Sequence, residues 1–294
     1  VLTDPIFHGL KEAGFETELI TKKKFDSVVR HNPHIDNILF HDEIKPEEMD
    51  TDILVDLHHN LRSRNLHHSI SAQRKSTVKK YYIKRWLYTK TGFHLKIPSV
   101  IERYKMAAEK ATKRKLFLKN LKFYPSDEKP IDIPDPFITL SLSSNWYTKE
   151  YPHRKKLLKL LLEKTPYNIC IVGTNDIKIE NERIYNLSDK YDIDVSANII
   201  KDSLFMVSVD TVWMHIGIGL DIPTFAIFGS TSPELGFISK FNQPLKIIQK
   251  EINCRPCTKI GRKECPRKHF KCMDEITPAE ILRKVEDEGF SKSS

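Results

Sequence analysis

The sequence lacks any hydrophobic run long enough to cross a membrane. Its 294 residues have a mean hydropathy of −0.43, and no apolar stretch approaches the ~20 residues that a membrane-spanning helix needs. We therefore expect that the protein is not an integral membrane protein. No secretory signal precedes Val1 either, so we expect a reducing compartment. Because VLTDPIFHGLKEAG is typical of a strand-to-helix turn already under way, we expect the native N-terminus to lie upstream.

Low-complexity tracts and short-period repeats are also missing. The chain does have ample material for packed cores, since 39% of its residues are hydrophobic and it contains 15 Phe, 10 Tyr and 3 Trp. This composition excludes wholesale disorder. At roughly 100–200 residues per domain, the length predicts two domains.

Acidic residues are nearly absent from residues 62–122. This segment holds 18 Lys and Arg but only Glu102 and Glu109, a net charge of +16, whereas the whole chain carries +9 and the remainder therefore −7. A single positive block of this kind favours an anionic partner, either nucleic acid or an anionic lipid surface. An ordinary solvated face rich in lysine is the alternative.

In both halves of the chain, short apolar strands alternate with helical patterns. This alternation predicts parallel, doubly wound sheets of the α/β class. In the first half, the pattern predicts strands at 17–21, 37–40 and 53–57 and helices at 4–13, 22–31 and 101–118. In the second half, it predicts strands at 137–142, 168–172, 205–209, 224–228 and 246–249 and helices at 153–164 and 278–287.

Four prolines fall within residues 124–136, a density typical of a linker. We predict that two domains flank this linker and that a ligand binds in the cleft between them. The predicted parts are an N-terminal domain at 1–125 whose first strand is truncated, a linker at 126–136, a second domain at 137–275, and a C-terminal helix and tail at 276–294.

Four of the five cysteines are clustered near the C-terminus. Their pattern, Cys254-x2-Cys257-x7-Cys265-x6-Cys272, is close to the spacing of structural zinc sites. Disulfides and reduced packing are the alternatives, and a reducing compartment counts against disulfides. The fifth, Cys170, lies in the apolar run YNICIVG and is expected to be inert core. We expect neighbouring cations to favour thiolates, and these cations are Arg255, Lys259, Arg262 and Lys268.

Polar residues follow two neighbouring strands in residues 206–233. Asp210 and Thr211 come after one strand and open a small apolar helix, and Gly229-Ser230-Thr231 follow the next strand. Open α/β sheets bind ligands at the carboxyl ends of their strands, and a helix N-terminus suits a phosphate or pyrophosphate. Alternatively, Asp210 only caps the helix.

These residues resemble the donor-site signature of glycosyltransferase family 9, the lipopolysaccharide heptosyltransferases. The family pattern D-T-G-x-M-H is similar to DTVWMH at 210–215, and the Pro, Phe-Gly, Thr and Pro that follow it are matched by Pro223, Phe228-Gly229, Thr231 and Pro233. Three further segments match in order. They are DLHHNLRS at 56–63, WYTKEYP at 146–152, and the cysteine-rich segment that ends in Cys272-Met273.

The resemblance implies a GT-B fold, in which two Rossmann-like doubly wound domains face a central cleft. It implies an inverting glycosyltransferase that requires no cofactor or catalytic metal and moves heptose from ADP-heptose onto the inner core of lipopolysaccharide. Lys149 matches the family lysine that meets the donor diphosphate, where a cation offsets the charge that grows on the leaving phosphate. The donor-binding residues implied are Thr148, Lys149, Asp176, Asp210, Thr211, Val212, Met214 and His215.

The family's N-terminal domain receives the acceptor, a phosphorylated lipid at the membrane face. The candidate acceptor residues are His58, Asn60, Arg62 and Arg64, since arginine suits carboxylates and phosphates through its planar fork. The basic block at 62–122 would hold the protein to an anionic surface without a spanning helix. We therefore expect a cytoplasmic protein that is peripheral on the bacterial inner membrane.

Two positions depart from the family pattern. Val212 stands where the family has glycine, and the Gly-Asp pair that carries the family's general base would lie ahead of Val1, which leaves Asp4 as a weak substitute. A binding-only family member is therefore one alternative. The other is a nucleic-acid-binding protein that uses the basic block, on which four aromatic residues could stack bases. These are Tyr81, Tyr82, Trp86 and Tyr88.

Overall fold

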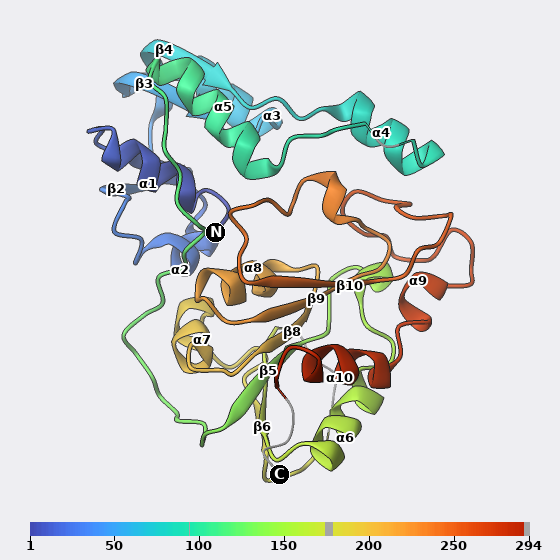
Figure 1. Ribbon diagram of the computed structural model, residues 1–294. Helices are drawn as coiled ribbons and strands as arrows, with labels where there is room; N and C mark the ends of the chain where they lie inside the picture. The colour runs from blue at the N-terminus through green and yellow to red at the C-terminus, as the bar shows by residue number, and fades with distance from the viewer. Residues whose placement is uncertain (94, 174–178, 291–294) are drawn as a thin grey trace.

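The computed structural model describes residues 1–93, 95–173 and 179–290, which form two α/β halves, one above the other in Figure 1. The upper half in that view holds the N-terminal residues, and the lower half holds the long sheet and the C-terminal helix α10 (Pro278–Glu286). Across the described residues, no helix is both long and apolar enough to span a bilayer.

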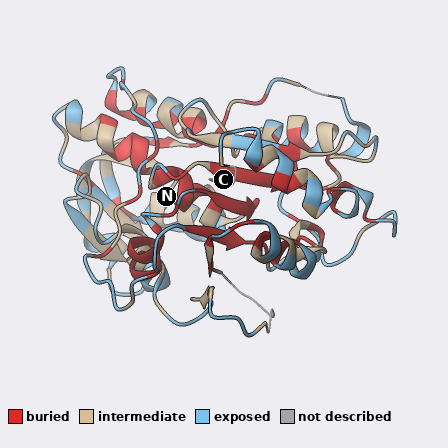
Figure 2. Ribbon diagram, turned by 60° about the horizontal axis from the view of Figure 1, so that its bottom comes forward, coloured by how far each residue is buried: buried red, intermediate tan, exposed pale blue. Residues whose placement is uncertain are grey.

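The C-terminal half is built on one parallel sheet of six strands in the order β10-β9-β8-β5-β6-β7. From the central strand β5, the sheet continues through β6 and β7 on one side and through β8, β9 and β10 on the other. This is the strand order of a Rossmann sheet. Its central strands are buried on both faces (Figure 2), as expected for continuous apolar runs. The strands are β5 (Phe137–Ser141), β6 (Asn168–Ile171), β7 (Ile184–Asn186), β8 (Met206–Val209), β9 (Thr224–Phe228) and β10 (Leu245–Gln249).

The helices of this half cover the sheet and join its strands. The structure confirms the two predicted helices and the small apolar helix after Asp210, which is α8, and it adds α7, α9 and the 3-10 turns η3 and η4. Their bounds are η3 (Tyr147–Lys149), α6 (Arg154–Lys164), α7 (Ile193–Ile200), α8 (Val212–Gly219), η4 (Pro233–Leu235), α9 (Lys271–Asp274) and α10 (Pro278–Glu286). The three-residue strand β7 was not predicted, because it is too short to show a period.

The N-terminal half is α/β, but its strands form two separate parallel pairs, β1-β2 and β3-β4, in place of the single doubly wound sheet predicted. Its elements are α1 (Asp4–Glu12), β1 (Glu18–Thr21), η1 (Lys23–Phe25), α2 (Asp26–Val29), β2 (Asn37–Phe40), η2 (Pro46–Glu48), β3 (Asp50–Asp56), α3 (Leu61–Ser69), β4 (Ser71–Thr77), α4 (Tyr82–Thr91) and α5 (Val100–Thr112).

Three differences from the predicted elements have local causes. The helix predicted at 101–118 ends at Thr112, because Lys113 adopts a left-handed conformation with φ 57°. Strand β4 was missed because its sequence, SAQRKST, is polar except for Ala72. Helix α3 was missed because LRSRNLHHS has no apolar stripe, and only its capping box, formed by Asn60 and Ser63, signals its start.

The two halves are tied together by hydrogen bonds where the chain crosses between them. The Phe123 amide donates to the Gly219 carbonyl over 2.9 Å. Close to this crossing, the fully buried Asp194 carboxylate of α7 accepts from Arg30 at 2.7 Å and lies 3.0 Å from His31 Nε2. A buried carboxylate is stable only with such partners. These contacts fix the halves in their relative positions.

Glycine at 219 is required by this crossing. A Cβ there would lie 2.8 Å from the Phe123 backbone nitrogen, whereas a Cβ at Gly217 would meet the flexible Met206 thioether. We expect Gly219→Ala to lower the free energy of unfolding by about 1–3 kcal/mol, because backbone must shift, and Gly217→Ala to cost less. Urea titration of both variants measures the difference. Equal stability of the two variants would contradict this account.

Candidate active site

Asp210, at the carboxyl end of β8, is the centre of the donor-signature residues. Its buried carboxylate lies 3.1 Å from Lys149 Nζ and accepts a hydrogen bond of 2.8 Å from the Thr231 hydroxyl. Lys149 comes from the turn after β5, and Thr231 from the loop after β9. Three neighbouring strands of one sheet therefore contribute to this cluster, as expected where parallel strands end on the same edge.

A second layer of hydrogen bonds holds these loops. Ser230 donates to the Thr148 hydroxyl at 2.9 Å, and that hydroxyl also accepts from the Arg262 amide at 2.8 Å. The Arg255 guanidinium donates to the carbonyls of Gly229 (2.5 Å) and Thr231 (3.0 Å). Arg255 and Arg262 were considered in the sequence only as neighbours of the cysteines. They fix the loop that carries Thr231.

Helix α8 begins directly beside Asp210. Thr211 is its N-cap residue, and its hydroxyl is buried with no hydrogen-bond partner among the described residues. Val212 is the first helical residue, is 42% exposed, and is not among the described residues with positive φ. The backbone at this position therefore does not require glycine. The amides of the first helical turn have no partner within the helix, and together with the helix dipole they favour an anion.

His215 lies one turn further along α8 and is uncharged at neutral pH. Burial lowers its pKa to about 4, and its Nδ1 atom has no hydrogen-bond partner in the part of the chain that the structure describes. Met214, its neighbour, is fully buried in an apolar cluster with Leu121 and Phe228. The remaining donor candidate, Asp176, lies outside the described residues.

Asp4 is held in the junction between the halves. Its carboxylate accepts hydrogen bonds from the Asn32 side chain at 3.0 Å and from the Lys122 amide at 2.8 Å. Burial raises the pKa of Asp4, and these two donors partly offset that shift. The carboxylate links α1 to the crossing chain, a geometry that favours a structural role.

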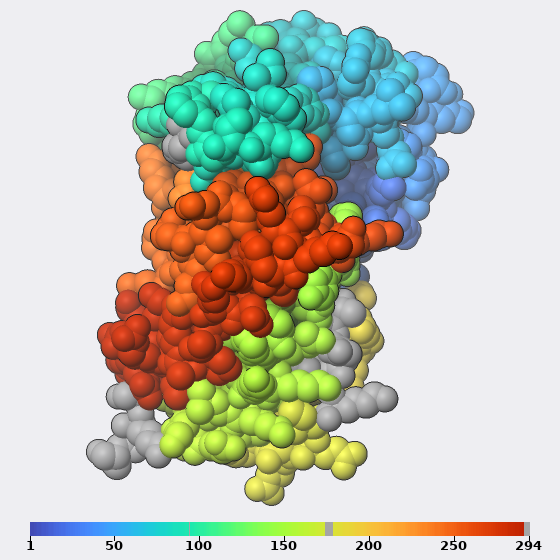
Figure 3. Space-filling model, turned by 90° about the vertical axis from the view of Figure 1, so that its right-hand side faces the viewer, coloured from blue at the N-terminus to red at the C-terminus, as the bar shows by residue number. Residues whose placement is uncertain are grey.

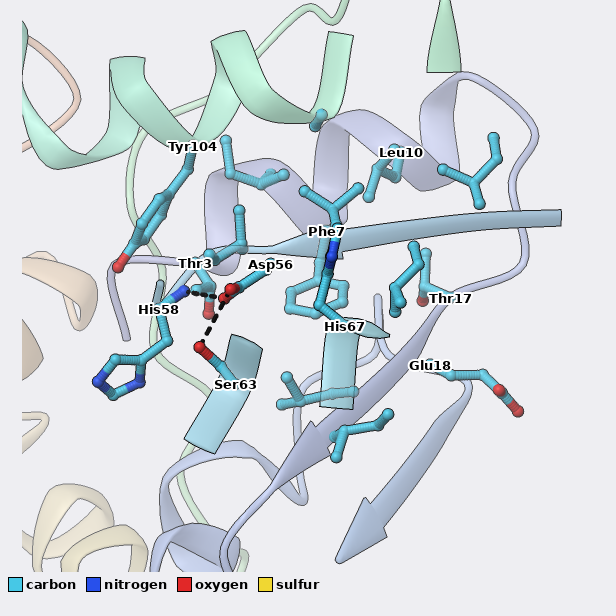
Figure 4. A pocket seen from close by; sticks show the side chains of 18 of the residues that line it. Thr3, Phe7, Leu10, Thr17, Glu18, Asp56, His58, Ser63, His67 and Tyr104 are labelled. Atoms are coloured by element: carbon cyan, nitrogen blue, oxygen red, sulfur yellow. Dashed lines mark hydrogen bonds between the residues drawn. The ribbon is translucent and has the colours of Figure 1, made fainter. Parts of the chain in front are cut away.

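The acceptor candidates surround a turn organised by Asp56, at the end of β3. Figure 4 shows its carboxylate accepting from the His58 amide (2.8 Å) and the Ser63 hydroxyl (3.1 Å). Asn60 caps α3 through its side chain, which accepts from the Ser63 amide. The remaining three candidates are exposed and are free to meet a ligand; they are His58, Arg62 and Arg64.

The C-terminal cysteines are free thiols, as is Cys170, and all five lie in the described residues. Cys254 Sγ lies 3.8 Å from His269 Nε2, but no group of three or more His, Cys, Asp or Glu side chains in the described part of the chain is arranged to hold a metal ion. Burial raises the pKa of Cys257 and raises that of Cys272 to about 12. The neighbouring Arg262 and Arg255 lower these two pKa values, as expected for cations, but the effect of burial is larger.

Comparison with known sequences gives a match over most of the chain. The profile described as "Glycosyltransferase family 9 (heptosyltransferase)" matches residues 52–268. A lipooligosaccharide heptosyltransferase 2 of Campylobacter jejuni (serotype O:6) is 30% identical over 127 residues, or 42% of this chain and 37% of that protein. The corresponding protein of Haemophilus ducreyi is 27% identical over 47% of this chain and 42% of its own length. The matches thus span less than half the length of these curated relatives.

Solved structures resemble the whole chain at low identity. A glycosyl transferase of family 9 from Veillonella parvula superimposes with a TM-score of 0.72 at 16% identity, over 97% of this chain and 92% of that one. The E. coli heptosyltransferase WaaC with ADP gives 0.69 at 14% identity, over 97% and 95% of the two chains. Similarity at this level of identity concerns the fold, and it confirms the predicted GT-B type.

The buried neutral state of His215 predicts a pH-dependent stability. Because its folded pKa of about 4 is below the ordinary 6.5, its contribution to stability is present above pH 6.5 and is lost as pH falls toward 4. In that window the loss is about 1.4 kcal/mol per pH unit. We expect His215→Gln to remove this part of the pH dependence in urea titrations at pH 7 and pH 5. An unchanged slope would contradict the assignment.

Proposed function

The chain belongs to glycosyltransferase family 9, and we propose that it transfers heptose from ADP-heptose to the inner core of lipopolysaccharide, with inversion at the transferred carbon. The observation that carries this proposal is the cluster of Lys149, Asp210 and Thr231 at the N-terminus of α8. Two of the similar solved structures are described as a heptosyltransferase with ADP and with a fluorinated ADP-heptose, which supports the choice of donor.

The donor diphosphate would bind where α8 begins. The opposite charges of Lys149 and Asp210 nearly cancel, so the pair has little net charge with which to attract an anion. The amides and the dipole of α8 would supply that attraction for the phosphates. Lys149 uses one of its three ammonium protons on Asp210 and has two left for phosphate oxygens. The buried, unpartnered Thr211 hydroxyl and the neutral His215 ring add donors without adding charge.

In the chemical step, these groups would act on the leaving group, which is the nucleoside diphosphate. As the bond to the sugar breaks, negative charge grows on the diphosphate, and Lys149 with the α8 amides would stabilise it. An attacking acceptor hydroxyl also needs a base within hydrogen-bond reach. Asp4 already accepts two hydrogen bonds, from the Asn32 side chain and the Lys122 amide, and this counts against Asp4 as that base.

The binding-only alternative rests on two departures from the family pattern, Val212 and the absence of the Gly-Asp pair from this sequence, and the structure bears on the first. Since this residue begins α8 with an ordinary helical backbone and its side chain is 42% exposed, it leaves the helix amides available. This supports an active transferase. The acceptor would approach from the N-terminal half, where His58, Arg62 and Arg64 lie on or before α3 and could meet its phosphates or carboxylates.

Titration calorimetry of ADP and ADP-heptose into the protein, with UDP, GDP and single-stranded RNA alongside, tests the donor site. We expect Lys149→Ala to weaken ADP binding roughly 10- to 100-fold, because a charge-assisted hydrogen bond is lost. Lys155→Ala on α6 is the matched control, since that lysine is exposed and lies away from Asp210. Silence toward every nucleotide with salt-sensitive RNA binding would favour the nucleic-acid alternative.

We propose further that the protein is peripheral on the cytoplasmic face of the inner membrane, and that α4 makes the contact. Tyr82, Ile83 and Trp86 fall within one ~100° arc of this helix and are 54%, 81% and 59% exposed. The opposite arc carries Arg85, over the Phe237 ring, and Tyr88, whose hydroxyl lies 3.2 Å from Ser232 Oγ, so it packs against the C-terminal half. Figure 3 shows the helix (teal) at the surface.

The lysines around this apolar arc match an anionic lipid surface. Lys79, Lys84 and Lys90 flank the exposed aromatic and aliphatic side chains. Apolar groups inserted among headgroups, together with ~1 kcal/mol per cation near the surface, are sufficient for reversible attachment.

Sedimentation with vesicles of phosphatidylglycerol and phosphatidylcholine tests this surface. We expect Ile83→Asp to weaken binding roughly tenfold or more, since a buried aliphatic side chain contributes ~1.5–3 kcal/mol. Phe117→Ser is the control, because Phe117 is 74% exposed in the same basic block but lies beyond α5. Equal loss in both variants, or equal binding to phosphatidylcholine alone, would refute the assignment to α4.

A further inference from the structure

The loop between β10 and α9 is a second strongly basic segment of the chain. Residues 254–271, here called the basic loop, hold seven Lys and Arg and only one acidic residue, Glu264, a net charge of +6. Outside this loop and the block at 62–122, the chain carries −13. Positive charge is therefore concentrated in two segments, one in each half. Six of the seven cations in the loop are exposed, namely Lys259, Arg262, Lys263, Arg267, Lys268 and Lys271.

A tight turn at residues 258–263 has an inner side that packs against the candidate active site. The Arg262 amide donates to the buried Thr148 hydroxyl over 2.8 Å, and Thr148 directly precedes Lys149. Gly261, with φ 111°, has no room for a Cβ, which would meet the side chain of Trp146. Backbone groups thus make the inner contacts of the turn, and its position beside the donor-signature residues is fixed.

The outer side of the same turn presents an aliphatic side chain between cations. Ile260 is 46% exposed, and Lys259 and Lys263 on either side of it are exposed as well. The Thr258 hydroxyl holds this shape, since it accepts from the Ile260 amide at 3.3 Å. An exposed aliphatic residue flanked by lysines is typical of a surface that inserts among lipid headgroups, because the apolar group leaves water while the cations meet phosphates.

The turn and α4 form one continuous surface, although they belong to different halves. Lys259 Nζ lies 5.6 Å from the centre of the Tyr82 ring, and Tyr82 is the first residue of α4. Figure 3 shows α4 (teal) and the basic loop (orange) one above the other on the same face of the molecule. The exposed aliphatic residue of the turn is therefore close to the exposed apolar arc of α4.

The chemistry of the turn favours an anionic lipid surface over other anions. Single-stranded nucleic acid binds on aromatic faces where its bases stack, and residues 258–263 include no aromatic side chain. A free phosphate would meet the lysines but would leave Ile260 in water. A layer of anionic headgroups satisfies both, since its phosphates pair with the cations and its acyl boundary accepts the aliphatic side chain.

We propose that the 258–263 turn is a second contact with an anionic lipid surface, so that the membrane touches both halves of the protein. This contact adds to the peripheral attachment through α4 proposed above, on which the inference rests. Because the inner side of the turn holds Thr148, the lipid surface would lie beside the donor site. An acceptor embedded in that membrane would then meet the donor without leaving the lipid.

Sedimentation of the full chain with phosphatidylglycerol vesicles tests the contact. We expect Ile260→Asp and Lys263→Glu each to weaken binding roughly three- to tenfold, because one removes an inserted side chain and the other reverses a charge near the headgroups. Leu204→Asp and Lys155→Glu are the matched controls in the same half, and we expect them to have little effect. Leu204 is 37% exposed and precedes β8, at the opposite end of that strand from Asp210.

Two further measurements show whether the turn and α4 contact the membrane together. If both belong to one bound state, the double variant Ile83→Asp/Ile260→Asp will lose the product of the two single factors. Amide hydrogen exchange with and without phosphatidylglycerol vesicles locates the contact. We expect exchange in residues 258–263 and in α4 to slow by about threefold or more when vesicles are present.

The outcomes separate this contact from the attachment through α4. Slower exchange in α4 alone, with Ile260→Asp bound as tightly as the unsubstituted protein, would overturn the inference and leave the α4 attachment standing. No binding of the unsubstituted protein to phosphatidylglycerol vesicles would overturn both. If single-stranded RNA slowed exchange in the turn as much as vesicles do, and Ile260→Asp did not change this, the turn would be a nucleic-acid contact and the inference would also fail.

Discussion

A buried carboxylate at a strand end is the constraint on which the candidate active site depends. The Asp210 side chain is buried at the edge of the sheet. A carboxylate that has lost its hydration there and has no partner would strongly destabilise the fold. Lys149 and Thr231 satisfy it, and each lies on a different loop. Because the carboxylate needs both partners, it fixes the distance between the loops after β5, β8 and β9. The N-terminus of α8 therefore lies beside loops that are already held in place.

The two halves show how much a parallel sheet depends on its central strand. In the C-terminal half β5 is fully buried and is paired on both edges, and the apolar core forms around it. In the N-terminal half the helices are in place but the strand pairs are separate, and no residue of β1 is fully buried. Within the described residues β1 and β3 are each paired on one edge only, whereas β5 is paired on both, and this difference separates two strand pairs from a continuous sheet.

Not all of the positive charges in the basic block at residues 62–122 reach the surface of the protein. Arg85 and Arg103 are buried, and Arg103 donates to the carbonyls of Ser99 and Lys80. Desolvation and the neighbouring Arg85 lower the pKa of Arg103 to about 10. Both arginines therefore contribute to the contact of α4 and α5 with the C-terminal half. The charge available to an anionic surface comes from the lysines that remain exposed.

The sequence by itself determined the C-terminal sheet and the identity of its polar edge. Its strands are short apolar runs bounded by turn residues, and parallel strands bring Lys149, Asp210 and Thr231 to one edge whatever lies between them in the chain. The family resemblance rested on the same residues. Periodicity could not reveal β4 or α3, because polar residues dominate both. Strand β4 is stabilised by pairing with β3 and by a hydrogen bond from Ser76 to the Ala107 carbonyl of α5, and α3 begins at a capping box.

Contacts between distant residues were decided by the tertiary structure alone. The hydrogen bonds from Arg262 to Thr148 and from Lys122 to Asp4 join residues more than a hundred positions apart, and no local pattern encodes them. Such contacts supply the hydrogen bonds to the Asp4 carboxylate and place the Arg255 guanidinium against the Thr231 carbonyl. They also bury part of the basic block. The physical reason is that burial and hydrogen-bond partners depend on which segments meet, whereas periodicity reports only which face of a segment is apolar.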